Sequence, residues 1–315
     1  MNIAEGIALS EIALGDSKRG VPELEARAFD VMDYYMERGG RTFDSARIYN
    51  DGGADRAFGK WLRERGIARD SVQLVTKGSH PDLAAMHINR LSAEEIERDL
   101  DESLALAQVE YSDLHLLHRD DVKLPVEEIM PSLDALVRKG KARAIGVSNW
   151  TVTRIAQANE FALQNGLEPI RCSQVLFSLA QTTAAATGDL THIIMNEVEL
   201  RWYRDSQLPV MCFGAQARGW FAARAEGREP QASPRKYFDL LPENHRRLIR
   251  LRKLAEKLGR PMAAITTAYV RDHGLNAVAL CSFSSRKQLD EVFEAEAFRL
   301  TPDQIKYLET GVGTC

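Results

Sequence analysis

The sequence predicts a single (β/α)8 barrel that spans residues 1–315. Short apolar runs rich in Val, Ile and Leu alternate with longer stretches of helical periodicity, and eight such pairs follow one another without a shift in composition. A barrel of ~250 residues plus one long loop and a C-terminal helix accounts for the length. The doubly wound alternative normally carries G-x-G-x-x-G after its first strand, and the sequence contains neither that motif nor G-x-x-x-x-G-K-[ST].

The predicted strands are short apolar runs, as expected of strands that are buried on both faces. In chain order they are 7–14, 41–44, 72–76, 112–117, 142–147, 170–174, 209–213 and 277–281.

The predicted helices follow from periodicity and from end signals. Ser92 with Glu95 three residues later forms a capping box for a helix over 93–107, and Thr301 before a proline is a typical helix start. The other predicted helices are 23–38, 54–65, 126–139, 151–164, 189–205, 245–258, 262–271 and 286–294. The stretch 214–244 is rich in Gly, Pro and Arg and aperiodic, so we predict an irregular loop near a site. The basic run 246–253 alternates with Leu and Ile and is interpreted as a solvated helix face.

Charge and hydropathy exclude several classes of protein. There are 41 basic and 45 acidic residues, a net charge of −4 and a pI near 6.0, which argues against a nucleic-acid binder. Mean hydropathy is −0.30 and no stretch reaches the ~18 apolar residues of a membrane span. The N-terminus lacks the features of a signal peptide. Four scattered cysteines, interpreted as the core residues Cys172, Cys212 and Cys281 and the tail thiol Cys315, fit a reduced, cytoplasmic protein.

Polar side chains recur where the predicted strands end. Asp44 closes the second strand, Tyr49 lies in the loop that follows it, Lys77 follows the third strand and His118 the fourth. The C-terminal strand ends of a (β/α)8 barrel form its active-site face, so these four side chains are expected to converge. Later strand ends carry Ser148, Asn149, Gln174, Phe213 and Ser282.

Four segments that carry these residues resemble the aldo-keto reductase family. They are TFDSARIY at 42–49, VTK at 75–77, DLHLLH at 113–118 and KGKARAIGVSN at 139–149, and the resemblance covers nearly the whole chain. It implies an oxidoreductase that reduces an aldehyde or ketone to an alcohol by hydride transfer from NADPH.

The family pattern assigns roles to the four residues. Tyr49 is the general acid, His118 orients the carbonyl, and Lys77 with Asp44 tunes the tyrosine. The chemistry fits, because hydride addition builds negative charge on oxygen and a proton donor is needed. A tyrosine with a reference pKa of about 10 is a weak acid unless a nearby cation favours its phenolate.

The resemblance also implies contacts with a nicotinamide cofactor, NADP being favoured and NAD possible. Ser148, Asn149 and Gln174 match positions that bind the carboxamide, although polar residues there also cap strand ends. Phe213 matches the aromatic that stacks on the nicotinamide. Further predicted contacts are Gly214, Gln216, Gly219, Ser282, Ser284, Arg286 and Gln288.

Two departures from the family pattern leave the choice between NADP and NAD open. A basic residue often stands about where this chain has Ser285. Arg286 and Lys287 follow directly and either substitute for it or begin a solvated helix. Glu291 is followed by Val292, where an Asn usually faces adenine.

The remaining site predictions concern substrate and metal. His80, Trp150 and Trp220 are predicted to border the substrate pocket, with ordinary packing an equally good interpretation. His115 and His118 have the spacing of a metal pair, but residues three apart on a strand face opposite sides, so no metal is predicted.

Two other functions stay open. One is a slow or non-catalytic nicotinamide-binding regulatory subunit, and the presence of all four residues argues against it. The other is a lyase that forms a Schiff base on Lys77, and it is disfavoured because a charged, paired lysine is a poor nucleophile. The expected partner is a small carbonyl compound, with neither nucleic acid nor membrane, and no oligomeric state is predicted.

Overall fold

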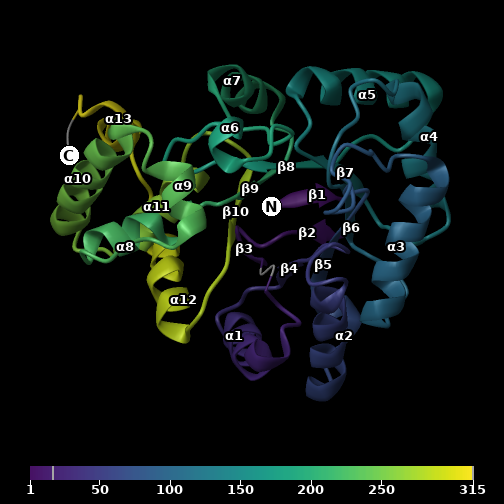
Figure 1. The fold of residues 1–315 in the computed structure, drawn as a ribbon, viewed down its shortest axis with the longest axis horizontal. Coiled ribbons are helices and arrows are strands. Elements are labelled where there is room, and N and C mark those ends of the chain that lie inside the picture. Colours follow the sequence, from purple (N-terminus) through teal and green to yellow (C-terminus); the bar gives the residue numbers. More distant parts are fainter. Residues whose placement is uncertain (16–17, 314–315) are drawn as a thin grey trace. The chain divides into compact units, whose positions relative to one another are not determined.

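The computed structural model describes residues 1–15 and 18–313. Cys315, predicted to be a tail thiol, lies outside the described residues. Contacts within the chain divide it into two compact units, residues 1–174 and 175–315, which are coloured purple to teal and teal to yellow in Figure 1.

The first unit consists of parallel strands that alternate with helices. From β3 to β8, each strand pairs in parallel with the next along the chain. The strands are β3 (Ile12–Gly15), β4 (Thr42–Asp44), β5 (Gln73–Gly78), β6 (Leu114–Leu117), β7 (Ile145–Ser148) and β8 (Cys172–Leu176), the last of which runs past the end of the unit. The helices are η1 (Pro22–Leu24), α1 (Glu25–Glu37), α2 (Gly53–Arg65), η2 (Arg69–Ser71), α3 (Ala93–Ala107), α4 (Val126–Arg138) and α5 (Val152–Asn165).

The second unit is mainly helical. Its strands β9 (Val210–Phe213) and β10 (Ala277–Cys281) pair in parallel. The helices are α6 (Ala184–Thr187), α7 (Glu197–Ser206), η3 (Ala217–Gly219), α8 (Trp220–Ala225), α9 (Ala232–Phe238), α10 (Pro242–Leu258), α11 (Met262–Arg271), α12 (Arg286–Phe293), η4 (Glu294–Ala297) and α13 (Pro302–Thr310).

Among the described residues, β3 to β10 are the eight parallel strands of a closed barrel. The predicted (β/α)8 fold class is therefore confirmed. No helix in residues 1–15 and 18–313 combines the length and the hydropathy that a membrane span requires.

Aromatic packing fixes the strands that carry the first predicted site residues. Phe43 on β4 packs against Tyr35 of α1 and Trp61 of α2, with ring centroids 5.3 and 5.0 Å apart. The Tyr35 hydroxyl donates to the carbonyl of Ile12 at 2.7 Å and lies 3.1 Å from that of Thr42. One buried side chain thus joins α1 to the backbones of both β3 and β4.

The N-terminal prediction is wrong in part. Residues 7–14 do not form one strand, because β2 (Ile7–Ala8) pairs antiparallel with β1 (Asn2–Ala4) and only β3 joins the barrel. The break coincides with contacts that Ser10 makes with a distant segment of the chain. The backbone N–H of Ser10 donates to the Thr42 hydroxyl, and its own hydroxyl accepts from the backbone of Arg41.

Two predictions for the second unit also need correction. The helix predicted over 189–205 begins only at Glu197, where Asn196 forms a capping box with Glu199. The stretch 214–244 is not irregular throughout, since it contains η3, α8, α9 and the start of α10. These helices are short, so their periodicity is weak in the sequence.

The basic run 246–253 is not wholly solvated. Arg247 is buried and donates to the Leu179 carbonyl at 2.7 Å. Arg250 pairs with Glu243 at 2.8 Å and donates to two carbonyls at the end of α13. Both arginines hold α10 against neighbouring segments.

Helices α2 and α3 approach closely at a glycine. A Cβ added to Gly59 would lie 1.8 Å from the carbonyl oxygen of Ala107, and a backbone atom cannot move aside as a side chain can.

We therefore expect Gly59→Ala to destabilise the protein. Alanine gains about 1 kcal/mol in helix propensity, but overpacking costs about 3 kcal/mol, which leaves a net loss of about 2 kcal/mol. Urea denaturation followed by circular dichroism measures it. Glu64→Ala on the same helix is the control, with a change below about 0.5 kcal/mol. A Gly59→Ala midpoint equal to that of the control would contradict the close approach.

Candidate active site

A buried ion pair lies at the C-terminal ends of β4 and β5. Lys77 Nζ lies 2.6 Å from both carboxylate oxygens of Asp44, and both side chains are excluded from solvent. Gln174 at the end of the first unit donates its amide to Asp44 Oδ1 at 2.9 Å. Burial alone would lower the pKa of Lys77, but the charges and hydrogen bonds of Asp44 and Tyr49 outweigh it and raise the pKa. The amine is therefore an ammonium at neutral pH.

Tyr49 lies beside this ammonium. Lys77 Nζ is 5.1 Å from the centre of the Tyr49 ring. Loss of surrounding water raises the pKa of Tyr49, and the Lys77 charge is the strongest opposing influence. Burial prevails, so the phenol keeps its proton at neutral pH. As predicted, the charge of Lys77 lowers the pKa of Tyr49, but burial outweighs it, so the pKa of Tyr49 stays above its ordinary value.

His118 completes this group from the end of β6. Its ring meets that of Tyr49 edge to face with centroids 5.8 Å apart, and its backbone N–H donates to Gly78 at 2.8 Å. His80, three residues after Lys77, packs against His118, since the two ring centroids are 4.8 Å apart. The structure thus brings together the four residues that were predicted to converge, and adds His80 to them.

His115 has a different environment from His118. It is fully buried, its Nδ1 lies 2.9 Å from the Thr76 hydroxyl, and burial lowers its pKa to about 3. His115 is therefore a neutral core residue, while His118 lies beside Tyr49.

Polar side chains tie the ends of β6, β7 and β8 together. The Ser148 hydroxyl donates to the Gln174 carbonyl at 2.9 Å. Asn149 adopts a left-handed φ of 60° and its amide lies 3.1 Å from Ser148 Oγ and 3.3 Å from the His118 carbonyl. These contacts show strand-end capping, and the predicted carboxamide contacts stay a prediction.

In the second unit, the loop after β9 is held by an internal network. Phe213 is partly exposed at the end of β9, and Gly214 has a left-handed φ of 73°. Gln216 donates to Thr267 at 2.6 Å and to the Ala263 carbonyl at 3.1 Å. The Gln216 amide therefore anchors this loop to α11. Gly219, with φ 79°, begins α8.

The segment after β10 is exposed and polar. Ser282, Ser284, Arg286 and Gln288 are all exposed, and α12 begins at the N-cap Ser285. The Gln288 side chain accepts from the Ser284 backbone at 2.7 Å, so it takes part in this helix start.

The two tryptophans of the predicted substrate pocket are fully buried. Trp150 points its indole N–H at the Arg119 carbonyl, 3.4 Å away, and Trp220 donates to Asp239 at 2.7 Å. Ordinary packing describes both in this structure, and a role in substrate binding stays a prediction.

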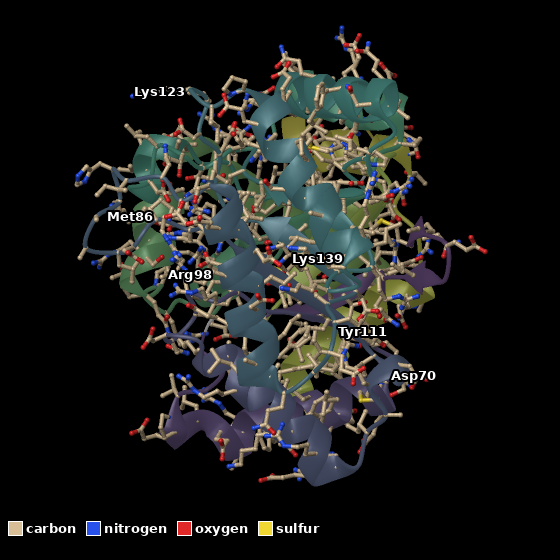
Figure 2. All side chains as sticks on the ribbon, turned by 90° about the vertical axis from the view of Figure 1, so that its right-hand side faces the viewer. Asp70, Met86, Arg98, Tyr111, Lys123 and Lys139 are labelled. Atoms are coloured by element: carbon tan, nitrogen blue, oxygen red, sulfur yellow. The ribbon has the colours of Figure 1, made fainter. Side chains whose placement is uncertain are left out.

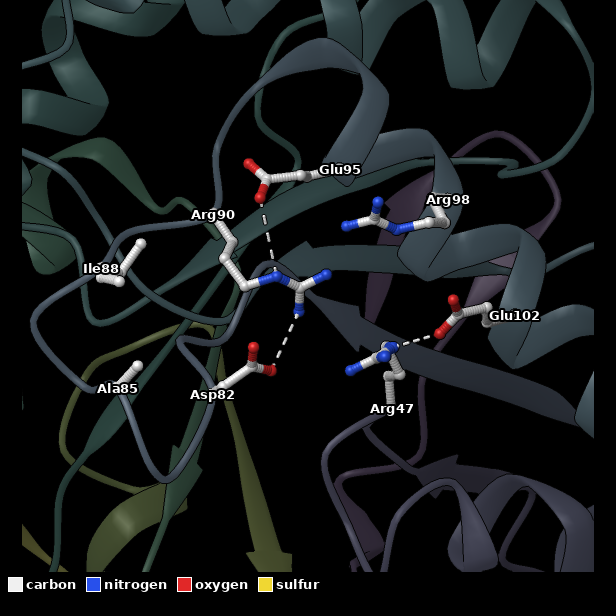
Figure 3. A pocket seen from close by; sticks show the side chains of 8 residues that line it. All are labelled: Arg47, Asp82, Ala85, Ile88, Arg90, Glu95, Arg98 and Glu102. Atoms are coloured by element: carbon white, nitrogen blue, oxygen red, sulfur yellow. Dashed lines mark hydrogen bonds and ion pairs between the residues drawn. The ribbon is translucent and has the colours of Figure 1, made fainter.

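A cavity of about 470 Å³ lies beside the loop that follows β5. It is lined by Arg47, Asp82, Ala85, Ile88, Arg90, Glu95, Arg98 and Glu102, whose side chains surround it in Figure 3. Figure 2 labels Met86 and Arg98 left of centre, and Tyr111 and Asp70 to the right. The lining residues come from the loops after β4 and β5 and from α3, so the cavity lies on the side of the C-terminal strand ends.

Sequence reasoning missed the polar residues behind the predicted site. Asp55 and Asp99 are buried carboxylates on α2 and α3, and Arg90 is a buried guanidinium. A signal for Asp99 was available, because it lies between Ile96 and Ser103 on the buried face of α3. A charge on the apolar face of a predicted helix indicates a buried partner.

The fold and these residues define a class of protein. A family model described as the aldo/keto reductase family matches residues 11–311, so the chain belongs to that family of oxidoreductases that act on carbonyl groups.

Individual relatives are distant. The chain is 27% identical over 312 residues to the uncharacterized oxidoreductase YrpG of Bacillus subtilis, covering 96% of this chain and 92% of that protein. It is 27% identical over 318 residues to norsolorinic acid reductase A of Aspergillus parasiticus, covering 96% and 76%.

Two solved structures from Klebsiella pneumoniae are similar. An aldo-keto reductase in complex with NADPH has a TM-score of 0.69 and 24% identity, over 96% of this chain and 91% of that one. At that identity the likeness shows the fold alone. An aldo/keto reductase in complex with NADP and acetate has a TM-score of 0.68 and 25% identity, over 96% and 92%.

We expect Tyr49 to ionise above the ordinary tyrosine pKa of about 10, because burial outweighs Lys77. The phenolate absorbance of the wild type minus that of Tyr49→Phe, recorded against pH, isolates this one group. Circular dichroism at each pH is the control for unfolding. A difference signal that rises near neutral pH would contradict the assigned balance.

Proposed function

We propose that the protein is an NADP-dependent carbonyl reductase with Tyr49 as its general acid. The observation that carries the proposal is the buried Lys77–Asp44 pair, whose ammonium lies 5.1 Å from the Tyr49 ring centre. Family membership supports the reaction class. The cofactor assignment is supported by the Klebsiella pneumoniae aldo/keto reductase at 25% identity, which is in complex with NADP and acetate.

Each residue of the group has a defined task in this reaction. Tyr49 enters it protonated and gives its hydroxyl proton to the substrate oxygen as negative charge builds there. Lys77 stabilises the resulting phenolate, and Asp44 keeps the ammonium in place by a charge-assisted bond. His118 lies against Tyr49 and orients the carbonyl.

The hydride is what a bound nicotinamide supplies, since the side chains of this group cannot provide one. The described residues fit such a group chemically. Phe213 offers a partly exposed ring, and α12 presents an exposed N-terminus with Arg286 in its first turn. We propose as cofactor contacts Ser148, Asn149, Gln174, Phe213, Gly214, Gln216, Gly219, Ser282, Ser284, Arg286 and Gln288.

The substrate proposal is a small aldehyde or ketone. His80 is the proposed pocket residue with the best geometric support, because its ring lies 4.8 Å from that of His118. Trp150 and Trp220 are proposed only as walls behind other side chains, since both are buried.

The Schiff-base alternative is disfavoured by the same ion pair. A nucleophilic lysine must lose its proton, whereas the surroundings of Lys77 raise its pKa. The regulatory alternative is disfavoured by the presence of all four residues in one group, since Lys77 contacts Asp44 and Tyr49, and Tyr49 contacts His118.

Tyr49→Phe is expected to lower kcat for carbonyl reduction by about 10²–10⁴-fold, because the ring remains and only the acid is lost. Oxidation of NADPH and NADH with a panel of aldehydes and ketones gives the activity. NADPH binding by fluorescence is the control and should be unchanged. Equal turnover by wild type and variant would remove Tyr49 from the mechanism, and absence of turnover in the wild type would favour the regulatory alternative.

Borohydride treatment in the presence of the same carbonyl compounds is expected to leave Lys77 unmodified, because its amine is protonated and paired with Asp44. Intact mass and peptide mapping measure the adduct. Lys77→Arg is the matched control, as any label it retains comes from other lysines. A label on the wild type that this variant loses would support the lyase.

A further inference from the structure

A single buried carboxylate lies behind the candidate active site. Asp99 on α3 is fully buried and accepts a hydrogen bond from the backbone N–H of Ser79 at 2.8 Å. It pairs with Arg90 Nη2 at 2.5 Å and with Arg47 Nε at 3.5 Å. Its three partners come from different parts of the chain.

Two of these partners belong to the segments that carry Lys77 and Tyr49. Ser79 is two residues after Lys77 and has a left-handed φ of 60°, a strained conformation that persists only where its surroundings fix it. Arg47 is two residues before Tyr49, and its backbone N–H donates to the Lys77 carbonyl at 3.0 Å. Asp99 therefore contacts both segments.

The third partner closes the loop that begins at His80. Arg90 ends this loop, and its Nη1 lies 3.3 Å from the His80 carbonyl. The His80 ring packs on that of His118. Asp99 thus reaches the environment of His118 through Arg90 and His80.

Helix α3 packs closely against the end of β5 at Gly78. A Cβ added to Gly78 would lie 2.8 Å from the Cβ of Asp99 and 3.3 Å from the His115 ring. Helix α3 is therefore pressed against the end of β5 at the residue that follows Lys77.

The charges that line the adjacent cavity indicate that its arginines anchor the surrounding loops and do not form a ligand site. Its lining holds three arginines and three carboxylates, and Asp99 behind it adds a fourth negative charge. Figure 3 shows Arg47 directed toward Glu102, and Arg90 toward Asp82 and Glu95. With the local charge already compensated, the arginines serve to hold the loops.

We propose that Asp99 is a positioning residue of the reductase reaction, which holds the segments of Tyr49, Lys77 and His80 in register through Ser79, Arg47 and Arg90. The proposal rests on the proposed function for its catalytic consequence. Asp99 itself does not touch the reacting atoms. Its effect is to keep the Tyr49 hydroxyl aligned with the Lys77 ammonium.

The test is Asp99→Asn, which keeps an oxygen for the Ser79 N–H but removes the charge that holds both arginines. We expect kcat for carbonyl reduction to fall about 10- to 100-fold, as for a misplacement of about 1 Å, with NADPH affinity and the KM of the carbonyl unchanged. Asp101→Asn is the matched control. It removes the same charge from the same helix, where Asp101 is exposed and pairs with Lys141.

A second measurement needs no substrate. The charged and polar groups that face Tyr49 are Lys77 from β5, Asp44 from β4, and Arg119 and His118 from the end of β6. The titration compares Asp99→Asn with the double variant that also carries Tyr49→Phe, so the difference reports Tyr49 alone. If Asp99→Asn lets Tyr49 move away from Lys77, the pKa of the Tyr49 phenol rises. Loss of the negative charge of Asp99 alone would lower that pKa, so the direction of the shift distinguishes lost alignment from a simple change of charge.

Variants of Arg90 test whether Asp99 acts through this arginine. Arg90→Lys retains a cation beside Asp99 and is expected to keep more activity than Arg90→Gln, and Asp99→Asn combined with Arg90→Gln should be no worse than Asp99→Asn alone. An Asp99→Asn protein with the kcat and the Tyr49 titration of Asp101→Asn would overturn the proposal. If the wild type reduces no carbonyl, the proposed function fails, and the titration still decides whether Asp99 aligns Tyr49.

Discussion

The burial of Lys77 and Asp44 is the constraint on which the architecture of the first unit depends. Removing either charge from water costs several kcal/mol, and only close pairing with further hydrogen bonds offsets it. Both carboxylate oxygens of Asp44 lie 2.6 Å from Lys77 Nζ, and Gln174 adds a third bond. Such geometry requires β4 and β5 to be neighbours in a fixed register, with Asp44 opposite Val75. The aromatic cluster around Phe43 and the close contact of α2 with α3 maintain that register from outside.

The same pair explains why a tyrosine is suitable here. Loss of surrounding water opposes ionisation of the Tyr49 phenol, so in the proposed reaction Tyr49 would retain the proton that reduction consumes, while the ammonium beside it would lower the cost of the phenolate left behind. A carboxylic acid in that position, with a reference pKa of about 4, would be ionised beside the Lys77 ammonium at neutral pH and would have no proton to give. The ion pair therefore selects an acid that is weak in isolation and is assisted only when it reacts.

Features of the fold and site that depend on neighbouring residues in the sequence could be predicted, whereas features that depend on contacts between distant segments could not. Strands such as β7 and β9 and helices such as α3 were predicted to within a few residues, because their periodicity and caps are local. Asp44, Lys77 and His118 could be predicted because polar residues at the ends of buried strands are conspicuous. Tyr49 lies in the loop after β4, and the family resemblance of its segment singled it out. The hairpin of β1 with β2 was missed since the run 7–14 is uniformly strand-like until Thr42 engages Ser10. The short helices α8 and α9 were missed for want of periodicity.

Buried charges were the hardest to predict, and Asp99 shows the physical reason. Its sequence neighbourhood on α3 is rich in acids, which apart from Asp99 are exposed or half-buried, and only the fold shows that this one faces Ser79, Arg47 and Arg90. Arg247 is the counterpart in the second unit, a buried residue within a run that looked solvated. In both cases the helix face decides whether a charge is solvated or paired. A charged residue on the apolar face of a helix next to a catalytic strand is therefore a better guide to supporting residues than the overall charge of the segment.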